Sequence, residues 1–298
     1  MAEFVQFVAA GLAVGAQYSL IVLGFVVIYR ATGIINFAQG GLVVLGAYLA
    51  YNATNTWGLP FPLAVVIAMA GGAAVGALVE LLILRRMIGE PVFAVIMITI
   101  GLLFVLEEVV TSVWGPDNLN LGDPWGVRST TVGEVTLSLK DIYTVALAAI
   151  VLAAFFWLFR YTRFGVAMRA TASDQEAALA QGISARRVVA LSWAVAGAVA
   201  ALAGVTAGAG SIQVRPTLGG IALFAFPAMI LGGLDSPGGA VLGGLIIGVT
   251  QVLTAGYQHE YAPWLGQGFE SVMPYVVMIA VLMLRPFGLF GTREVRRI

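Results

Sequence analysis

Long apolar runs dominate this chain, and short polar intervals separate them. A helix needs about 20 mostly apolar residues to cross the hydrocarbon core of a bilayer. The pattern therefore predicts an all-α, polytopic integral membrane bundle of about eight or nine segments, built as a single transmembrane domain over residues 1–298. The expected segments cover residues 4–29, 35–54, 61–84, 92–113, 141–160, 188–211, 218–234, 238–256 and 269–285.

Two of these segments differ from plain spans. Segment 35–54 opens with polar side chains, and segment 218–234 is short, follows Pro216 and is interrupted by Pro227. Short or broken helices at membrane depth occur where they are buried in protein or line a wet cavity. One interruption in each half of the chain is a typical sign of a translocation pathway. The alternative is a pair of kinks that only improve packing.

A glycine-rich turn follows the second interrupted segment. It contains Gly232, Gly233, Pro237, Gly238 and Gly239. Glycine widens the accessible backbone torsions, and proline removes a backbone donor. The turn is therefore expected to be a tight reversal, or hinge, between two helices.

The basic residues are distributed unevenly over the intervals between the segments. With the N-terminus outside and the C-terminus inside, twelve basic residues fall on the inner face and three on the outer face. The positive-inside rule favours this orientation. The inner set is Arg30, Arg85, Arg86, Arg160, Arg163, Arg169, Arg186, Arg187, Arg285, Arg293, Arg296 and Arg297, and the outer set is Arg128, Lys140 and Arg215.

The longest inner interval, residues 161–187, contains a helix signature. Ser173 and Glu176 have the spacing of a capping box, in which the serine hydroxyl accepts from a first-turn amide and the glutamate reaches back. The helix is expected to continue through residues 177–180 and to end at Gly182, a left-handed cap. A short, alanine-lined helix on the cytoplasmic side indicates a docking element. The alternative is an ordinary interfacial helix.

The outer interval, residues 114–140, is rich in turn residues, and its apolar and polar residues alternate weakly near its end, so it predicts a small hairpin or a lid.

Few carboxylates fall within the predicted membrane segments. Glu80 precedes Arg85 by about one turn and is expected to pair with it or to snorkel. Glu107 and Glu108 lie in the outer third of their segment, and this shallow depth favours a structural role.

Composition excludes several kinds of chemistry. The chain is 60% hydrophobic and 10% charged, which separates it from soluble globular domains. It has no cysteine, a single histidine, His259, and a single lysine, Lys140, whose context excludes a phosphate-binding loop. We expect no enzymatic activity, no cofactor and no metal, and the cancelling charges give no indication of a nucleic-acid partner. The first apolar run has no basic residue before it, which predicts a retained span rather than a cleaved signal peptide.

Four stretches together resemble the permease subunits of branched-chain amino acid ABC transporters, specifically the H-type subunit of the high-affinity leucine, isoleucine and valine uptake system. Residues 34–40 (IINFAQG) are similar to an early signature of that family, and residues 163–184 to its cytoplasmic coupling loop. Residues 231–240 (LGGLDSPGGA) and 285–291 (RPFGLFG) resemble its later turn and its closing motif. Asp235 stands where the family turn has glycine, and residues 191–193 lack the proline of the general importer motif.

The resemblance implies a multi-pass protein of the bacterial plasma (inner) membrane. Its partners would be a second, related permease in a heterodimer, two cytoplasmic ATPase subunits and an external substrate-binding protein, with lipid around the spans. ATP hydrolysis would belong to the partner ATPases, coupled to alternating access. The residues implied for ATPase coupling are Arg169, Ser173, Asp174, Glu176, Ala177, Ala178 and Gly182, and those implied for the substrate pathway are Asn36, Phe37 and Gln39.

Two other functions remain open. The same family could import urea or a short amide, because related permeases share these motifs. An ion-coupled secondary carrier is a third hypothesis, and the lack of a deep carboxylate or histidine counts against it. Few charges along the route suit a neutral or zwitterionic substrate with an apolar body.

Overall fold

The computed structural model describes residues 2–87, 89–122, 124–125, 128–133, 135–210 and 213–291. Helices account for most of these residues, and two short strands lie between α4 and α5. The helices are α1 (Ala2–Thr32), α2 (Gln39–Tyr51), α3 (Phe61–Leu82), α4 (Val92–Trp114), α5 (Leu139–Tyr161), α6 (Arg163–Ser173), α7 (Gln175–Ala180), α8 (Ala185–Gly208), α9 (Ile221–Gly232), α10 (Pro237–Tyr261) and α11 (Met273–Leu284). Shorter turns of helix are Asn52–Thr56 (π) and Leu84–Met87, Pro216–Gly220, Pro263–Leu265 and Phe269–Ser271 (3-10).

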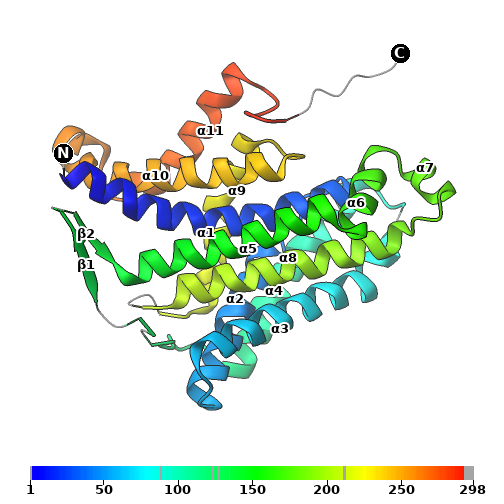
Figure 1. Ribbon diagram of the computed structural model, residues 1–298, viewed down its shortest axis with the longest axis horizontal. Coiled ribbons are helices and arrows are strands. Elements are labelled where there is room, and N and C mark those ends of the chain that lie inside the picture. Colours follow the sequence, from blue (N-terminus) through cyan, green and yellow to red (C-terminus); the bar gives the residue numbers. More distant parts are fainter. Residues whose placement is uncertain are drawn as a thin grey trace.

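Six helices within the described residues are long and apolar enough to span a bilayer, and they are Ala2–Thr32, Phe61–Met87, Val92–Trp114, Leu139–Tyr161, Ala185–Gly208 and Pro237–Tyr261. Three shorter apolar pieces, α2, α9 and α11, account for the other predicted segments. The long helices run side by side along the longest axis of the molecule (Figure 1). This confirms the predicted all-α, polytopic helical membrane protein.

The two ends of the bundle differ. One end carries the N-terminus and the β-hairpin, and the other carries α6 and α7 (Figure 1). We call these the hairpin end and the α7 end. Glu3 lies in the first turn of α1 and Arg30 in its last turn. These charges complement the helix dipole, which helps to explain why α1 extends beyond the predicted 4–29.

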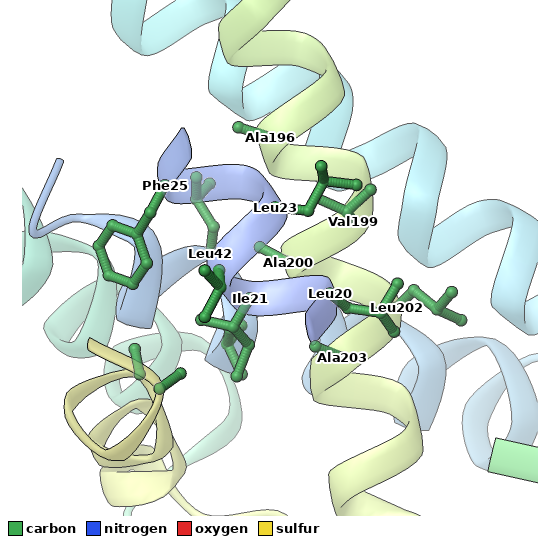
Figure 2. Packing of buried hydrophobic residues seen from close by; sticks show 14 of the residues in the cluster. Leu20, Ile21, Leu23, Phe25, Leu42, Ala196, Val199, Ala200, Leu202 and Ala203 are labelled. Atoms are coloured by element: carbon green, nitrogen blue, oxygen red, sulfur yellow. The ribbon is translucent and has the colours of Figure 1, made fainter. Parts of the chain in front are cut away.

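Helices α1 and α8 form the centre of the bundle. In the most apolar window of α1, 83% of the residues are buried, and in that of α8, 67%. The corresponding share is 22% for α3 and α4 and 17% for α5, so those helices present most of their surface to the outside of the bundle. Figure 2 shows the core where α1, α2 and α8 meet, formed by Leu20, Ile21, Leu23, Phe25, Leu42, Ala196, Val199, Ala200, Leu202 and Ala203.

Glycine pairs set the distance between the packed helices. A Cβ placed on Gly72 of α3 would lie 2.4 Å from the carbonyl oxygen of Gly197 in α8, and one on Gly248 of α10 would lie 2.2 Å from the amide nitrogen of Gly15 in α1. A side chain at either place would force the backbones apart. Lipid is as apolar as the helices, so close backbone packing of this kind is what holds membrane helices together.

The predicted hairpin in the interval 114–140 is present. Strand β1 (Ser129–Val132) pairs antiparallel with β2 (Val135–Ser138), with Thr130 opposite Leu137. The beginning of the interval is fixed to the segment after α8 by two backbone hydrogen bonds between Leu119 and Val214, of 2.9 and 2.8 Å. This interval is therefore attached to the bundle at more than its two chain ends.

Candidate functional site

The second predicted segment begins as an irregular turn rather than as a helix. Helix α2 starts at Gln39, not at residue 35, because Asn36 offers the backbone an alternative to helical bonding. The Asn36 side-chain oxygen accepts from the Ala38 amide at 3.0 Å, and the Phe37 amide donates to the Thr99 hydroxyl at 3.2 Å. Residues 34–38 thus lead into the helix in a fixed, non-helical conformation.

The first residue of α2 lies deep in the bundle. The side-chain nitrogen of Gln39, Nε2, donates to the backbone carbonyl of Ala196 at 3.4 Å and to that of Ile21 at 3.5 Å. Ala196 is at the middle of α8. A Cβ on Gly24 would lie 1.9 Å from Gln39 Nε2, so the glycine leaves the space that this side chain occupies. The N-terminus of α2 therefore begins near the midplane of the bundle.

Two polar atoms at this helix start lack partners. Asn36 is 1% exposed and Gln39 is fully buried, yet Asn36 Nδ2 and Gln39 Oε1 make no hydrogen bond within the described residues. An unsatisfied buried donor or acceptor costs about 1–3 kcal/mol. Two such atoms beside one helix start make this a polar point in an otherwise apolar interior.

A cavity of about 250 Å³ lies next to the start of α2. It is bordered by α1, α2, α4, the 3-10 turn Pro216–Gly220 and α9, so both interrupted segments contribute to it, and it opens to the surface beside the exposed Phe104 and Leu223. The residues that line it are Phe25, Phe37, Gly40, Leu103, Phe104, Glu107, Gly219, Gly220, Ala222, Leu223 and Phe226. Of the three predicted pathway residues, Phe37 lines the cavity, while Asn36 and Gln39 lie behind it in the protein interior.

Backbone contact joins the two interrupted segments at the cavity. A Cβ on Gly40 would lie 2.8 Å from the Gly219 carbonyl oxygen, and one on Gly219 would lie 2.9 Å from the Gly40 carbonyl oxygen. The two irregular segments that the sequence pattern singled out thus meet at one cavity. Neither Gly40 nor Gly219 was singled out, because the contact depends on tertiary packing.

Three phenylalanines form one wall of the cavity. The rings of Phe37 and Phe226 stack with centroids 5.8 Å apart and an interplanar angle of 28°. Phe25 meets Phe226 edge to face, with centroids 6.1 Å apart. Figure 2 shows the Phe25 ring on the side of α1 away from the labelled residues of α8. Such pairs add about 0.5–1.5 kcal/mol beyond burial and hold the wall in one geometry.

The neighbouring carboxylates of α4 have different surroundings. Glu107 lines the cavity, whereas Glu108 is exposed on the outside of the bundle. Within the described residues, the Glu107 carboxylate takes part in no ion pair. The same part of the chain holds no group of three or more His, Asp or Glu side chains suited to a metal. Glu107 is thus a cavity residue that its shallow depth in the sequence did not indicate.

The capping box predicted at Ser173 is wrong by one residue. Helix α6 continues through Ser173, whose hydroxyl donates to the Arg169 carbonyl at 3.0 Å. Asp174 is the N-cap of α7 instead, and its carboxylate accepts from the Ala177 amide at 2.9 Å. Because α6 ends only at Ser173, the first residue with extended torsions, which a cap requires, is Asp174.

The predicted end of this helix is confirmed. Gly182 has φ +79°, and its amide donates to the Leu179 carbonyl at 2.9 Å. The Ile183 amide donates to the Ala178 carbonyl at 3.0 Å. These two bonds make a Schellman motif, which satisfies carbonyls that have no partner inside the helix.

Most of α7 is available to a partner, because Ala178 is the one buried residue in Gln175–Ala180. Ala178 is 4% exposed and packs inside this chain, while Glu176, Ala177 and Leu179 are exposed, Leu179 by 52%. Of the predicted coupling residues on α7, Glu176 and Ala177 therefore belong to the accessible face. Ala178 belongs to the face that seats α7 on the bundle. We call Glu176, Ala177 and Leu179 the α7 face.

Arg169 attaches this region to the long helices. Its guanidinium lies over the Phe159 ring of α5, 5.2 Å from the centroid, and donates to the Phe159 carbonyl. Arg30, in the last turn of α1, lies over the same ring at 5.1 Å. We call these three side chains the Phe159 clamp. It joins α1, α5 and α6 at the α7 end.

The glycine-rich turn between α9 and α10 is a tight reversal, as predicted. Gly233 has φ +104°, and the Ser236 hydroxyl accepts from the Gly239 amide at 3.0 Å to cap α10. A Cβ on Gly232 would lie 2.2 Å from the Gly239 carbonyl oxygen, so the two ends of the turn touch through their backbones. Pro237 occupies the first turn of α10, where its missing donor has no cost.

The closing motif of the chain packs on this turn. The Leu289 amide donates to the Leu231 carbonyl at 2.8 Å, and the Phe290 amide donates to the Gly232 carbonyl at 3.2 Å. Two stretches that are more than 50 residues apart in sequence thus form one backbone-bonded unit.

The predicted Glu80–Arg85 ion pair is also present, at 3.1 Å between Arg85 Nη2 and Glu80 Oε2, with the Glu80 side chain only 1% exposed.

Comparison with known proteins gives a consistent family. The model of a branched-chain amino acid transport system permease component matches residues 7–282. The high-affinity branched-chain amino acid transport system permease protein LivH of Salmonella typhimurium is 30% identical, over 99% of this chain and 98% of its own length. The corresponding BraD protein of Pseudomonas aeruginosa is 28% identical over the same shares. This multi-pass membrane protein therefore belongs to the family of branched-chain amino acid transport system permease components.

Proposed function

We propose that the chain is the transmembrane permease subunit of an ATP-driven importer for branched-chain and other hydrophobic amino acids. The observation that carries this proposal is α7. It is capped at both ends, exposes the α7 face, and adjoins α6, which is fixed to two long helices by the Phe159 clamp. A short, rigid, accessible helix of this kind is suited to receive a force from a partner protein.

The proposed orientation places the α7 end in the cytoplasm and the hairpin end outside. Arg30, Arg160 and Arg169 gather near the α7 end, around α6 and the end of α5. Lys140 packs near Gly210 at the hairpin end, in the smaller outer set. This distribution agrees with the positive-inside rule. In this arrangement the interval 114–140 faces an external substrate-binding protein, and residues 161–187 face two cytoplasmic ATPase subunits.

These attachments support the proposal of alternating access. Closure of the ATPases on ATP would move α7, and the Phe159 clamp would transmit that movement to α5 and α1. The α1 ring of Phe25 lines the cavity, so a displacement of α1 changes the cavity walls. A second, related permease in the bacterial inner membrane would complete the pathway. The chain itself would hydrolyse no ATP.

The proposed substrate class rests on two relatives that match over almost the whole chain. LivH and BraD are named as branched-chain amino acid permeases, and they match this chain over almost its whole length. More partial matches are named as a nucleoside permease of Lactococcus lactis and a fructose import permease of Bifidobacterium longum. Urea or short amides within the same family, and an ion-coupled carrier outside it, are the competing proposals.

Uptake by whole cells separates these proposals. Labelled leucine and labelled urea would be supplied to cells that carry or lack this gene, with a protonophore or with ATP depleted while the ion gradient is held. The proposal expects gene-dependent leucine uptake that survives the protonophore and stops without ATP. Uptake of urea without uptake of leucine would favour urea or short amides as the substrate class. Uptake that is lost with the ion gradient while the ATP level stays constant would establish a secondary carrier.

A further inference from the structure

The cavity described above has opposite electrostatic character on two sides. Glu107 supplies a carboxylate from α4, and Gly40 lies in the first turn of α2. The first amides of a helix have no carbonyl within the helix to bond, and the helix start carries roughly half a positive charge. A broken helix that starts near the membrane midplane often turns this end towards an anionic substrate group.

These two sides are close together. The position of a Cβ on Gly219 would be 3.0 Å from Glu107 Oε1 and 2.9 Å from the Gly40 carbonyl oxygen, so these two oxygens are at most about 6 Å apart. An α-amino acid carries its ammonium and its carboxylate on the same carbon. A site for it therefore needs acceptors for the ammonium near donors for the carboxylate. The Glu107 carboxylate and the Gly40 carbonyl are the two acceptors, and the first-turn amides of α2 at Gly40 are the donors.

A second observation supports a ligand at this end of α2. Asn36 Nδ2, which lies behind the cavity wall and next in the chain to the cavity residue Phe37, is a buried donor without a partner in the described residues. Glu107 likewise forms no ion pair there. Unpaired donors and ionisable groups at membrane depth are costly and are typically retained for function.

The remaining lining is apolar and of the right size. Phe25, Phe37 and Phe226 form the aromatic wall, and Leu103 and Leu223 are among the other lining residues. The volume of about 250 Å³ corresponds to roughly eight water molecules at the density of the liquid. This is ample room for a small aliphatic amino acid.

We propose that this cavity is a binding site for a zwitterionic aliphatic amino acid within this subunit. The Glu107 carboxylate accepts hydrogen bonds from the α-ammonium, and the first-turn amides of α2 at Gly40 donate to the α-carboxylate. The aliphatic side chain lies against Phe25, Phe37 and Phe226. This inference deepens the proposed function and rests on it, because it assigns the amino acid a place on the route through the membrane.

Site-directed labelling tests the site directly, because the chain has no cysteine of its own. Ala222→Cys would place a single thiol in the cavity, and Asn118→Cys would place one in the exposed interval near the hairpin end. Both would be made in the assembled complex, without binding protein, and treated with a small water-borne thiol reagent. Millimolar leucine should slow labelling of Ala222→Cys about tenfold and leave Asn118→Cys unchanged.

Two leucine analogues identify the contacts. Leucinamide lacks the α-carboxylate, and 4-methylpentanoate lacks the α-ammonium. Both should protect Ala222→Cys at least about tenfold less well than leucine, since each lacks one of the two charged groups that the site would bind through hydrogen bonds. Equal protection by all three compounds, no protection by leucine, or no labelling of Ala222→Cys at all would overturn the site.

Transport by charge-neutral variants gives an independent readout. Glu107→Gln should lower the maximal rate of leucine uptake about tenfold or more. The external leucine concentration at half-maximal uptake, which the binding protein sets, should not change. Glu108→Gln, the exposed neighbour, should behave as wild type. Pull-down of the ATPase subunits would show that both variants assemble.

The failure of this site and the failure of the proposed function give different results. If wild-type complex takes up leucine with ATP and Glu107→Gln does so at the wild-type rate, the site is wrong and the importer stands. If wild-type complex takes up no leucine, the substrate class is wrong, and the labelling experiment then has no leucine protection to report. Loss of uptake in Glu107→Gln together with loss of leucine protection supports both.

Discussion

Arg169 of α6 and Phe159 of α5 are joined twice, by a guanidinium 5.2 Å above the ring and by a hydrogen bond from the guanidinium to the Phe159 carbonyl. One contact fixes the position of the arginine over the ring, and the other fixes its orientation. Helix α6 follows α5 after a single residue, Thr162, which caps it. The pair therefore holds α6, and α7 after it, at a set angle to the membrane helix.

Arg169→Ala should loosen this attachment. It removes a charge-assisted hydrogen bond and a cation–π contact, together about 2 kcal/mol for a partly buried pair. We expect faster hydrogen exchange throughout α6 and a weaker stimulation of ATPase activity by substrate in the assembled complex. Arg187→Ala removes an exposed arginine at the same end and should leave both measurements unchanged. Equal effects of the two changes would show that charge, and not the clamp, matters.

The α7 face should control binding of the ATPases. Ala177→Arg and Leu179→Arg each place a long charge on this exposed face, and each should abolish co-purification of the ATPase subunits while the chain still inserts in the membrane. Ala178→Arg is a poorer test, because Ala178 is buried and its replacement would damage the chain itself. Thr130→Arg, on the exposed hairpin, is the control. Normal co-purification of the α7 variants would contradict a docking role.

The observed cap of α7 separates two neighbouring residues. Asp174→Ala removes the acceptor for the Ala177 amide and should cost about 1 kcal/mol of local helix stability, which is about a fivefold faster exchange of α7 amides. Ser173→Ala should change little, because its hydroxyl only bonds back within α6. Hydrogen exchange followed by mass spectrometry measures both. A larger increase in α7 exchange for Ser173→Ala than for Asp174→Ala would show that Ser173 is the N-cap after all.

Two adjacent glycines in the α9–α10 turn should respond oppositely. Gly239→Ala has no room, because the backbone of Gly232 lies 2.1 Å from the position of the new Cβ. Gly238→Ala meets no atom within 4 Å and lies in the first turn of α10, where alanine is the better helix former. The apparent melting temperature of the complex should fall clearly for Gly239→Ala and stay equal or rise slightly for Gly238→Ala. Similar melting temperatures would show that the turn is less closely packed.

The buried Glu80 should make its arginine indispensable. Arg85→Ala leaves a carboxylate that is 1% exposed without its partner and should destabilise the protein by about 2 kcal/mol, less than for a fully buried pair because Arg85 is partly exposed. Adding Glu80→Gln to Arg85→Ala should restore most of the loss, because the buried charge is then gone. Arg86→Ala, at an exposed neighbour, is the control in the same melting assay. A double variant as unstable as Arg85→Ala would contradict this explanation.

Residue patterns alone predicted the features that depend on local chemistry. The apolar runs predicted the helices, Gly182 predicted the left-handed end of α7, and the turn residues of 114–140 predicted a hairpin. The Ser173 cap failed because a one-residue difference in where α6 ends moves the cap, and local propensity does not resolve that difference. The boundaries of adjoining short helices depend on how the helices pack. Here Thr162 caps the start of α6, and Arg169 fixes α6 to Phe159 of α5.

The cavity could not be read from the sequence. It needs Gly40 of α2 against Gly219, which is contributed by a turn more than 170 residues later, and Glu107 brought beside them by α4. The position of Glu107 along α4 predicted a structural role. Position along a helix does not show which side of the helix faces a cavity, so the prediction missed that Glu107 lines one. Of the three residues predicted for the pathway, Phe37 lines the cavity, while Asn36 and Gln39 lie behind it at the helix start, and a pathway role for them stays a prediction.

The central claim, that ATP moves a hydrophobic amino acid through this chain, is tested most directly in proteoliposomes. The complete complex would be reconstituted with ATP enclosed on the side of α7 and with the binding protein and labelled leucine on the side of the hairpin. We predict leucine accumulation that requires hydrolysable ATP and is lost in the Leu179→Arg complex. Accumulation driven by an imposed proton or sodium gradient without ATP would contradict the account.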